Sequence, residues 1–179
     1  MPRFTFTPLR EDDLDLARRW LLEPHVRRWW NDDPRERDYP QGTLDEWMAA
    51  VRGEDPTDMF MIQMDSRPIG VIQSYRVASY PDYVQEIGEL REPAFSLDLF
   101  IGEPDLIGKA VGPALLRDFL RMAFDKYELD YAIIGPARSN VAAIRSYEKI
   151  GFRYLKEYRE EDTTDPDHVL LDLRRSDLV

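Results

Sequence analysis

The sequence predicts an α/β protein in which helices flank a mixed β-sheet on both faces. Its central part contains two apolar runs, 59–64 and 69–77, joined by Asp65-Ser66-Arg67-Pro68, which is typical of a β-hairpin. From residue 94 onward, strand-like runs alternate with helical patterns, as in α/β proteins. A chain of 179 residues can bury a core of its own, so we expect one domain over residues 1–179.

The N-terminal half is expected to be mostly helical outside the hairpin. A short strand, 3–7, ends at Pro8, and Glu11-Asp12-Asp13 begins a helix whose dipole favours carboxylates there. A short helix over 25–30 and a polar loop over 31–42 follow, and Thr43 with Glu46 can form a capping box for a third helix. Residues 80–92 are acidic and are expected to be irregular.

The C-terminal half begins with a strand, 94–101, followed by a glycine-spaced loop, Ile107 to Gly112. Apolar residues at helical spacing then predict a helix from about residue 114. A short buried strand, 131–134, precedes a helix that Ser139 or Asn140 caps and Gly151 ends. Two further strands, 152–158 and 168–173, complete the sheet.

Composition excludes several classes of function. The formal net charge of −11 disfavours nucleic-acid binding, because phosphates would be repelled. The chain has no cysteine and two histidines far apart in sequence, so no metal site is expected. It shows no signal-peptide pattern and no apolar run long enough to span a membrane, which predicts a soluble cytoplasmic protein with no membrane partner.

The arrangement of strand, glycine loop and helix predicts a phosphate-binding site at residues 107–112. A helix N-terminus and bare backbone amides attract phosphate. Residues 107–153 carry eight basic and five acidic side chains, whereas the rest of the chain carries 16 and 30. The loop thus lies at the start of a basic segment in an acidic protein. Ordinary turn glycines before a helix would give the same glycine spacing.

Asp98 interrupts the apolar strand that precedes the loop. A carboxylate in such a strand is costly unless it is paired or used. A structural ion pair with an arginine is one interpretation. The other is a general base that acts on whatever the phosphate-bearing ligand delivers.

Four segments resemble the GCN5-related N-acetyltransferases, and most closely the aminoglycoside 6'-N-acetyltransferases. They are HVRRWW, RPIGVIQSY, SLDLFIGEP with the loop IGKAVG, and RSNVAAIRSYEKIGF, in that order. The resemblance covers roughly the whole chain and implies a sheet of about seven mostly antiparallel strands. It also implies direct transfer of an acetyl group from acetyl-CoA (coenzyme A) to an amine.

The resemblance implies roles for individual residues. Asp98 would take a proton from the substrate ammonium, directly or through water, and Tyr147 would protonate the departing thiolate. The coenzyme A contacts would come from strand, loop and helix: Leu99, Phe100, Ile101, Ile107, Gly108, Lys109, Ala110, Val111, Gly112, Pro113, Asn140, Ala143 and Ser146. A backbone amide near Leu99 or Phe100 would stabilise the oxyanion. Ile107, Ala110 and Pro113 depart from the family pattern, and Tyr147 could equally be a core aromatic.

Aromatic and acidic residues are candidates for the acceptor site beside Asp98: Trp29, Trp30, Tyr75, Tyr83, Glu86, Glu89 and Glu92. Rings suit a sugar-like body and carboxylates suit ammonium groups. Core packing of the tryptophans and a solvated acidic loop are the alternatives. Gly135-Pro136 stands where related 6'-acetyltransferases have an Asp-Pro that contacts the antibiotic, which favours a less cationic aminoglycoside or another amine.

The sequence therefore predicts an acetyl-CoA-dependent N-acetyltransferase that acts on an aminoglycoside-like antibiotic, conferring resistance. Another amine, such as a siderophore precursor, a polyamine or a protein N-terminus, is the first alternative. A non-catalytic acyl-CoA-binding protein is the second. The expected partner is a small amine, and the chain could be a monomer or a homodimer.

Overall fold

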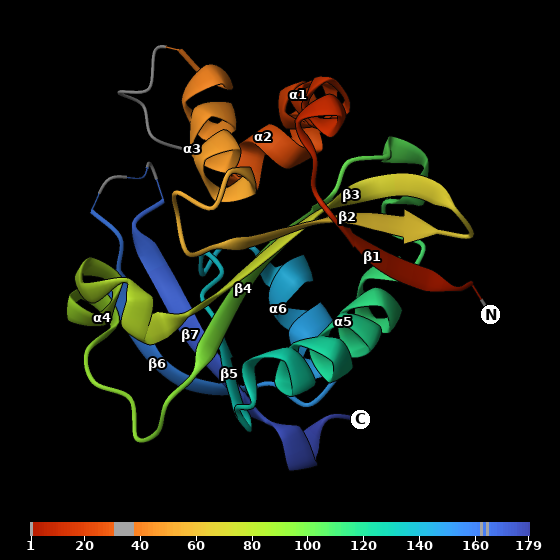
Figure 1. The fold of residues 1–179 in the computed structure, drawn as a ribbon. Coiled ribbons are helices and arrows are strands. Elements are labelled where there is room, and N and C mark those ends of the chain that lie inside the picture. Colours follow the sequence, from red (N-terminus) through yellow and green to blue (C-terminus); the bar gives the residue numbers. More distant parts are fainter. Residues whose placement is uncertain (1, 31–37, 162, 164) are drawn as a thin grey trace. The chain divides into compact units, whose positions relative to one another are not determined.

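The computed structural model describes residues 2–30, 38–161, 163 and 165–179, and these contain seven strands and six α-helices (Figure 1). The strands are β1 (Phe4–Pro8), β2 (Asp58–Met64), β3 (Arg67–Arg76), β4 (Phe95–Ile101), β5 (Tyr131–Ile134), β6 (Arg153–Arg159) and β7 (Asp167–Arg174). The helices are α1 (Leu14–Leu22), α2 (Pro24–Trp30), α3 (Gln41–Val51), α4 (Pro81–Ile87), α5 (Val111–Tyr127) and α6 (Val141–Glu148).

The strands are hydrogen-bonded in the order β1-β2-β3-β4-β5-β7-β6. Pairing is antiparallel between β1 and β2, β2 and β3, β5 and β7, and β6 and β7, whereas β4 and β5 are parallel. This confirms the predicted α/β class with a seven-stranded, mostly antiparallel sheet. The chain divides into two compact units, residues 1–74 with 98–109 and residues 75–97 with 110–179.

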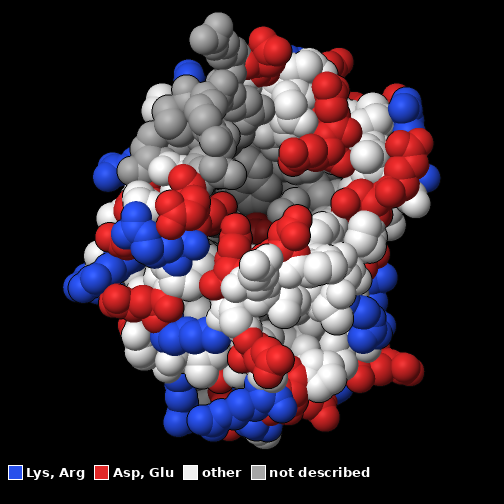
Figure 2. Space-filling model, turned by 90° about the vertical axis from the view of Figure 1, so that its left-hand side faces the viewer, with Lys and Arg blue, Asp and Glu red and all other residues white. Residues whose placement is uncertain are grey.

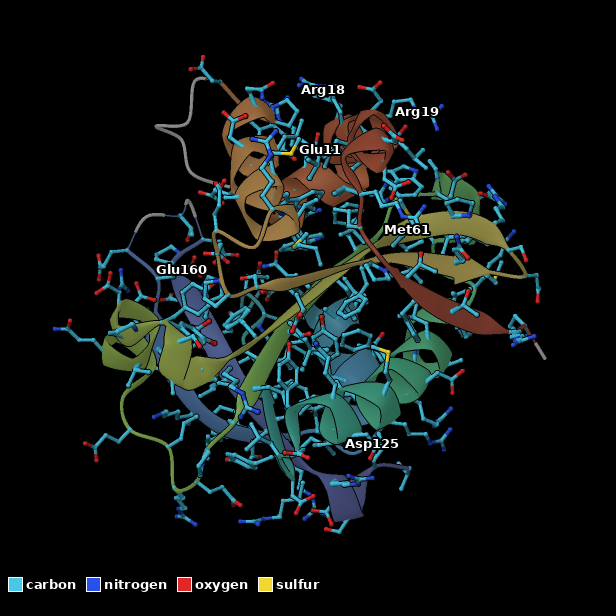
Figure 3. All side chains as sticks on the ribbon, in the orientation of Figure 1. Glu11, Arg18, Arg19, Met61, Asp125 and Glu160 are labelled. Carbon is cyan, nitrogen blue, oxygen red and sulfur yellow. The ribbon has the colours of Figure 1, made fainter. Side chains whose placement is uncertain are left out.

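The first unit combines the hairpin of β2 and β3 with α1, α2 and α3. Asp65 and Ser66 have φ angles of 51° and 69° and form the two-residue turn of the hairpin, the geometry that matches strand twist. The sequence placed this connection over four residues, but Arg67 and Pro68 already belong to β3. Helix residues such as Trp20 and Trp47 share a core with strand residues such as Met61, which Figure 3 labels on β2.

The second unit holds the start of β4 with β5, β7 and β6, and helices α4, α5 and α6. The buried ring of Phe95 lies 5.0 Å from the ring of Tyr127 and 5.2 Å from that of Phe124, both on α5. Five of the six apolar residues that predicted this helix are buried, and Ala114 is partly exposed. The buried ones are Leu115, Leu116, Phe119, Leu120 and Ala123. In Figure 1, α4 lies beside β6, with which it is in contact.

Two predictions about local structure were wrong. Residues 80–92 are not irregular throughout, because Pro81 begins α4; proline is well suited to a first helical position, where no amide hydrogen bond is lost. The third helix begins at Gln41 and not after a Thr43 cap, and Thr43 is buried inside it. The Gln41 side chain instead donates to Asp45 Oδ1 at 2.6 Å, one helical turn later. Most of the predicted loop 31–42 lies outside the described residues.

Carboxylates are frequent on the surface drawn in Figure 2, in keeping with the net charge of −11. Within the part of the chain that the structure describes, no helix is both long and apolar enough to cross a membrane. The same described residues contain no cluster of three or more potential metal ligands.

Candidate active site

Asp98 lies in the middle of β4, half-buried, where the sequence placed it. The side-chain amide of Gln73 on β3 donates a hydrogen bond to Asp98 Oδ2 at 3.0 Å. This contact orients the carboxylate. A general base must be held within hydrogen-bond reach of the proton that it takes, so an oriented carboxylate is compatible with that predicted role.

The part of β4 that follows Asp98 packs tightly against β3 and α2. A Cβ atom at Gly70 would lie 2.1 Å from the Phe100 carbonyl oxygen, so the two backbones meet where a side chain cannot fit. The Phe100 ring lies 5.0 Å from that of Trp30. Trp30, a predicted acceptor residue, is thus partly buried and packs against the core cluster that contains Phe100. Its neighbour Trp29 is 38% exposed, with the Arg28 guanidinium 4.6 Å from its ring centroid.

Two side chains that sequence reasoning overlooked fix the end of β4. His25 on α2 donates from Nε2 to the Ile101 carbonyl oxygen at 2.9 Å, and Trp20 on α1 donates from Nε1 to Glu103 Oε1 at 2.9 Å. Gly102 lies under the Trp20 indole, because a Cβ there would come within 2.1 Å of Trp20 Cγ. These pairs are 76 and 83 positions apart, and no local pattern could have indicated them.

The glycine loop leads directly into the N-terminus of α5. Gly108 and Ala110 have left-handed backbones, with φ of 76° and 56°, and α5 then runs for 17 residues from Val111. The amides of the first helical turn have no acceptor within the helix, and Pro113 in that turn therefore removes no helical hydrogen bond. No atom lies within 4 Å of a Cβ built at Gly108 or Gly112, and Lys109 is exposed.

The loop has three features that attract phosphate groups. Its backbone is open to an approaching ligand, its helix has the positive end of its dipole there, and Lys109 supplies a cation. Residues 107–109 belong to the first unit, and residues 110–113 begin the second. The role of this loop in binding phosphate stays a prediction.

Helix α6 begins at the cap that the sequence offered as one of two choices. Asn140 Oδ1 accepts from the Ala143 amide at 3.2 Å, which confirms Asn140 as the capping residue. The Ser146 hydroxyl donates to the Ala142 carbonyl oxygen at 2.9 Å, within the helix. Tyr147 is buried, and its ring centroid lies 6.0 Å from that of Phe152. The Tyr147 ring thus also fills the core, as the alternative interpretation of this residue expected.

The second unit brings together two of the predicted acceptor residues. The rings of Tyr75, at the end of β3, and Tyr83, on α4, lie 6.1 Å apart, and Tyr80 lies 4.8 Å from Tyr75. The glutamates differ from one another. Glu86 and Glu89 are exposed, whereas Glu92 forms an ion pair with Arg174. The Glu92 carboxylate is therefore already held by a cation of the protein.

Comparison with known proteins identifies relatives of the chain. Residues 10–159 match the model of an acetyltransferase (GNAT) domain. An aminoglycoside N(6')-acetyltransferase type 1 of Klebsiella pneumoniae is 27% identical over 164 residues, which cover 91% of this chain and 78% of that protein. The crystal structure of aminoglycoside acetyltransferase AAC(6')-Ib with coenzyme A has a TM-score of 0.81 at 24% identity, covering 97% of this chain and 96% of that one. A further structure of AAC(6')-Ib, with the same TM-score, identity and coverages, contains coenzyme A and kanamycin.

Proposed function

Given that the chain belongs to the GNAT acetyltransferase family, whose model spans residues 10–159, we propose that it acetylates an amine of an aminoglycoside-like antibiotic. It is an acetyl-CoA-dependent N-acetyltransferase. The acceptor class rests on one observation above all, the match to an aminoglycoside N(6')-acetyltransferase over 91% of this chain. The half-buried tyrosines and exposed glutamates of the second unit support it, because they suit a sugar that carries ammonium groups.

Acetyl-CoA supplies an activated acetyl group as a thioester. The amides of residues 108–112 and the Lys109 ammonium would hold its phosphates, and the open backbone at Gly108 and Gly112 lets them approach closely. Asn140 keeps α6 capped through its Oδ1 while its side-chain NH₂ can donate to the pantetheine arm. The predicted contact of Ser146 would have to use a hydroxyl that already donates to Ala142, so Ser146 would act as an acceptor.

The residues of β4 would carry out the acid–base step at the acceptor. An amine attacks a thioester only when it is neutral, so its ammonium must first lose a proton. Asp98, oriented by Gln73, would accept that proton directly or through water. A backbone amide of Leu99 or Phe100 would stabilise the negative charge that develops on the thioester oxygen.

Tyr147 would return a proton to the departing thiolate. Its ring is buried against Phe152, so its hydroxyl is held at one place on α6. In this scheme the acceptor nitrogen loses its first proton to Asp98 before attack and its second to solvent as the amide forms. The C–S bond breaks as the C–N bond is completed, the sulfur takes a proton from Tyr147, and Tyr147 regains a proton from solvent. The acetyl group passes to nitrogen in a single transfer.

The direct test measures free coenzyme A after acetyl-CoA is mixed with a panel of amines. The panel contains kanamycin, ribostamycin, a polyamine, a hydroxylamine-type siderophore precursor and a peptide with a free N-terminus. Release with the aminoglycosides alone supports the proposal. Release with another member and not with aminoglycosides refutes the acceptor class. Tight acetyl-CoA binding without release from any amine indicates a non-catalytic acyl-CoA-binding protein.

A further inference from the structure

The turn between β4 and the glycine loop carries two carboxylates, and one arginine binds both of them. Arg67, the first residue of β3, donates to Asp105 from Nη1 to Oδ2 at 3.2 Å and from Nη2 to Oδ1 at 3.0 Å. Its Nη2 also donates to Glu103 Oε2. Asp105 is thus held at both oxygens, in the bidentate geometry that suits a guanidinium.

The backbone of this turn is held in place independently of Arg67. The Gly102 amide donates to the Ile69 carbonyl oxygen at 2.8 Å, and the Leu106 side chain is buried. The Arg67 side chain is 48% exposed, so it contributes little to the core. Exposed ion pairs also contribute little to folding stability, and the three hydrogen bonds of Arg67 therefore call for another explanation.

The two carboxylates depend on Arg67 to different degrees. Glu103 has a second donor, because its Oε1 accepts from Trp20 Nε1 at 2.9 Å. Among the side chains that the structure describes, only Arg67 donates to Asp105. Loss of Arg67 would therefore release Asp105 and leave Glu103 with a partner.

A second cation, Lys109, lies within electrostatic reach of Asp105. Hydrogen bonds from Arg67 lower the pKa of the Asp105 carboxyl, and the charges of Arg67 and Lys109 lower it further. Lys109 is exposed and forms no ion pair with any residue that the structure describes. Asp105 thus has two cations near it and is bound to one of them, which leaves the other available to a ligand.

We propose that Arg67 is a positioning residue for the cofactor, which holds Asp105 so that Lys109 remains available to the phosphates of acetyl-CoA. With Arg67, the two carboxylates of the turn are balanced by two cations. Without it, Asp105 would pair with Lys109, and two carboxylates would be left with one cation beside an anionic ligand. The inference rests on the proposed role of the glycine loop in binding phosphate and does not depend on which amine is the acceptor.

The first experiment measures the Kd of coenzyme A by isothermal titration calorimetry, with no acceptor present. Arg67→Met should raise this Kd about fivefold at low ionic strength, the factor that corresponds to one contact between unit charges in water. In about 1 M NaCl the difference should shrink to less than about twofold, because the Debye length falls to about 3 Å. The KM for acetyl-CoA should rise in parallel, whereas kcat should stay within about twofold of wild type.

Arg52→Met is the matched control for the loss of one positive charge. Arg52 belongs to the same unit and is 53% exposed, and its Nε lies 3.0 Å from Oε1 of Glu11, which Figure 3 labels. The substitution removes a comparable ion pair outside the turn and the glycine loop. It should leave the Kd of coenzyme A within about twofold of wild type.

A double-mutant cycle with Asp105→Asn separates release of the carboxylate from other roles of Arg67. Asp105→Asn in the Arg67→Met background should return the Kd to within about twofold of wild type, and alone it should change the Kd by less than about twofold. The two effects are non-additive, as expected for residues that share a partner. If Arg67 bound phosphate itself, or only fixed the shape of the turn, the double variant would bind as weakly as Arg67→Met.

The outcomes separate this inference from the role of the loop on which it rests. If Lys109→Met weakens binding of coenzyme A but Arg67→Met does not, or if Asp105→Asn fails to rescue Arg67→Met, the inference is overturned and the role of the loop stands. If Lys109→Met and Gly112→Ala both leave the Kd unchanged, both are overturned. Acetylation of an amine other than an aminoglycoside would refute the acceptor class and leave the inference standing.

Discussion

The close approach of Gly70 to Phe100 makes a quantitative prediction about β4. Replacing Gly70 with alanine places a Cβ 2.1 Å from the Phe100 carbonyl oxygen, whereas real Cβ atoms essentially never come within 3.0 Å of another atom. The neighbour is backbone in a paired strand and cannot rotate away. The β3 and β4 backbones must therefore separate by roughly 1 Å, and overpacking of this kind costs about 1–3 kcal/mol.

The net effect on stability can be worked out from two opposing contributions. We take about 3 kcal/mol for the clash, because backbone must move. Alanine loses less conformational entropy than glycine on folding, which returns about 0.5–1 kcal/mol. The free energy of unfolding should thus fall by about 2 kcal/mol, which for a protein of this size lowers Tm by about 4–8 °C.

Thermal unfolding followed by circular dichroism measures this shift. Gly112→Ala is the matched control, because no atom lies within 4 Å of its added Cβ and the residue is inside α5. There alanine should raise the free energy of unfolding by about 0.4–1 kcal/mol. A Tm of Gly70→Ala equal to or above that of wild type would refute the reasoning about β3 and β4.

Three further predictions concern the site. Asp98→Asn should lower the rate of coenzyme A release by about 10²–10⁴ with an unchanged circular dichroism spectrum, as expected for loss of a general base; near-normal turnover would contradict the assignment. Asn140→Ala removes the 3.2 Å cap on the Ala143 amide and should cost about 1 kcal/mol, seen as a Tm lower by about 2–4 °C, and an unaltered Tm would show that the cap does not stabilise the fold. Gly112→Ala should raise the KM for acetyl-CoA severalfold although it stabilises the apoprotein, because the added methyl lies where the phosphates would approach; an unchanged KM would place them elsewhere.

Periodicity and capping residues predicted most of the fold. The buried positions of α5 follow the spacing of its apolar residues, and each of the seven strands was expected within a few residues of its observed bounds. Helix α4 was not predicted because it is only seven residues long, too short for the spacing of Tyr83, Val84 and Ile87 to stand out. The start of α3 was misplaced because Thr43, which matched a capping pattern, lies inside the helix that begins at Gln41. The local sequence pattern was ambiguous at both places, and tertiary packing decided where each helix begins.

Some features of the candidate site could likewise be predicted from the sequence, and others could not. The nature of the residues at Asp98, in the glycine loop and at Asn140 is visible in the sequence, since a carboxylate in an apolar strand, spaced glycines and a helix cap are local signals. Their partners are not, because Gln73 is 25 positions from Asp98 and His25 is 76 positions from Ile101. Such pairs depend on which strands and helices become neighbours.

Gly135 illustrates the limit most clearly. In the sequence, Gly135 stands where the 6'-acetyltransferases that the chain resembles have an aspartate. In the folded protein, the hydroxyl of Tyr158, 23 positions away in sequence, donates to the Gly135 carbonyl oxygen and lies where a Cβ at position 135 would be. Local periodicity determines which elements form. The order of strands brings β6 within reach of the end of β5, and that order is set by long-range burial, which no local pattern records.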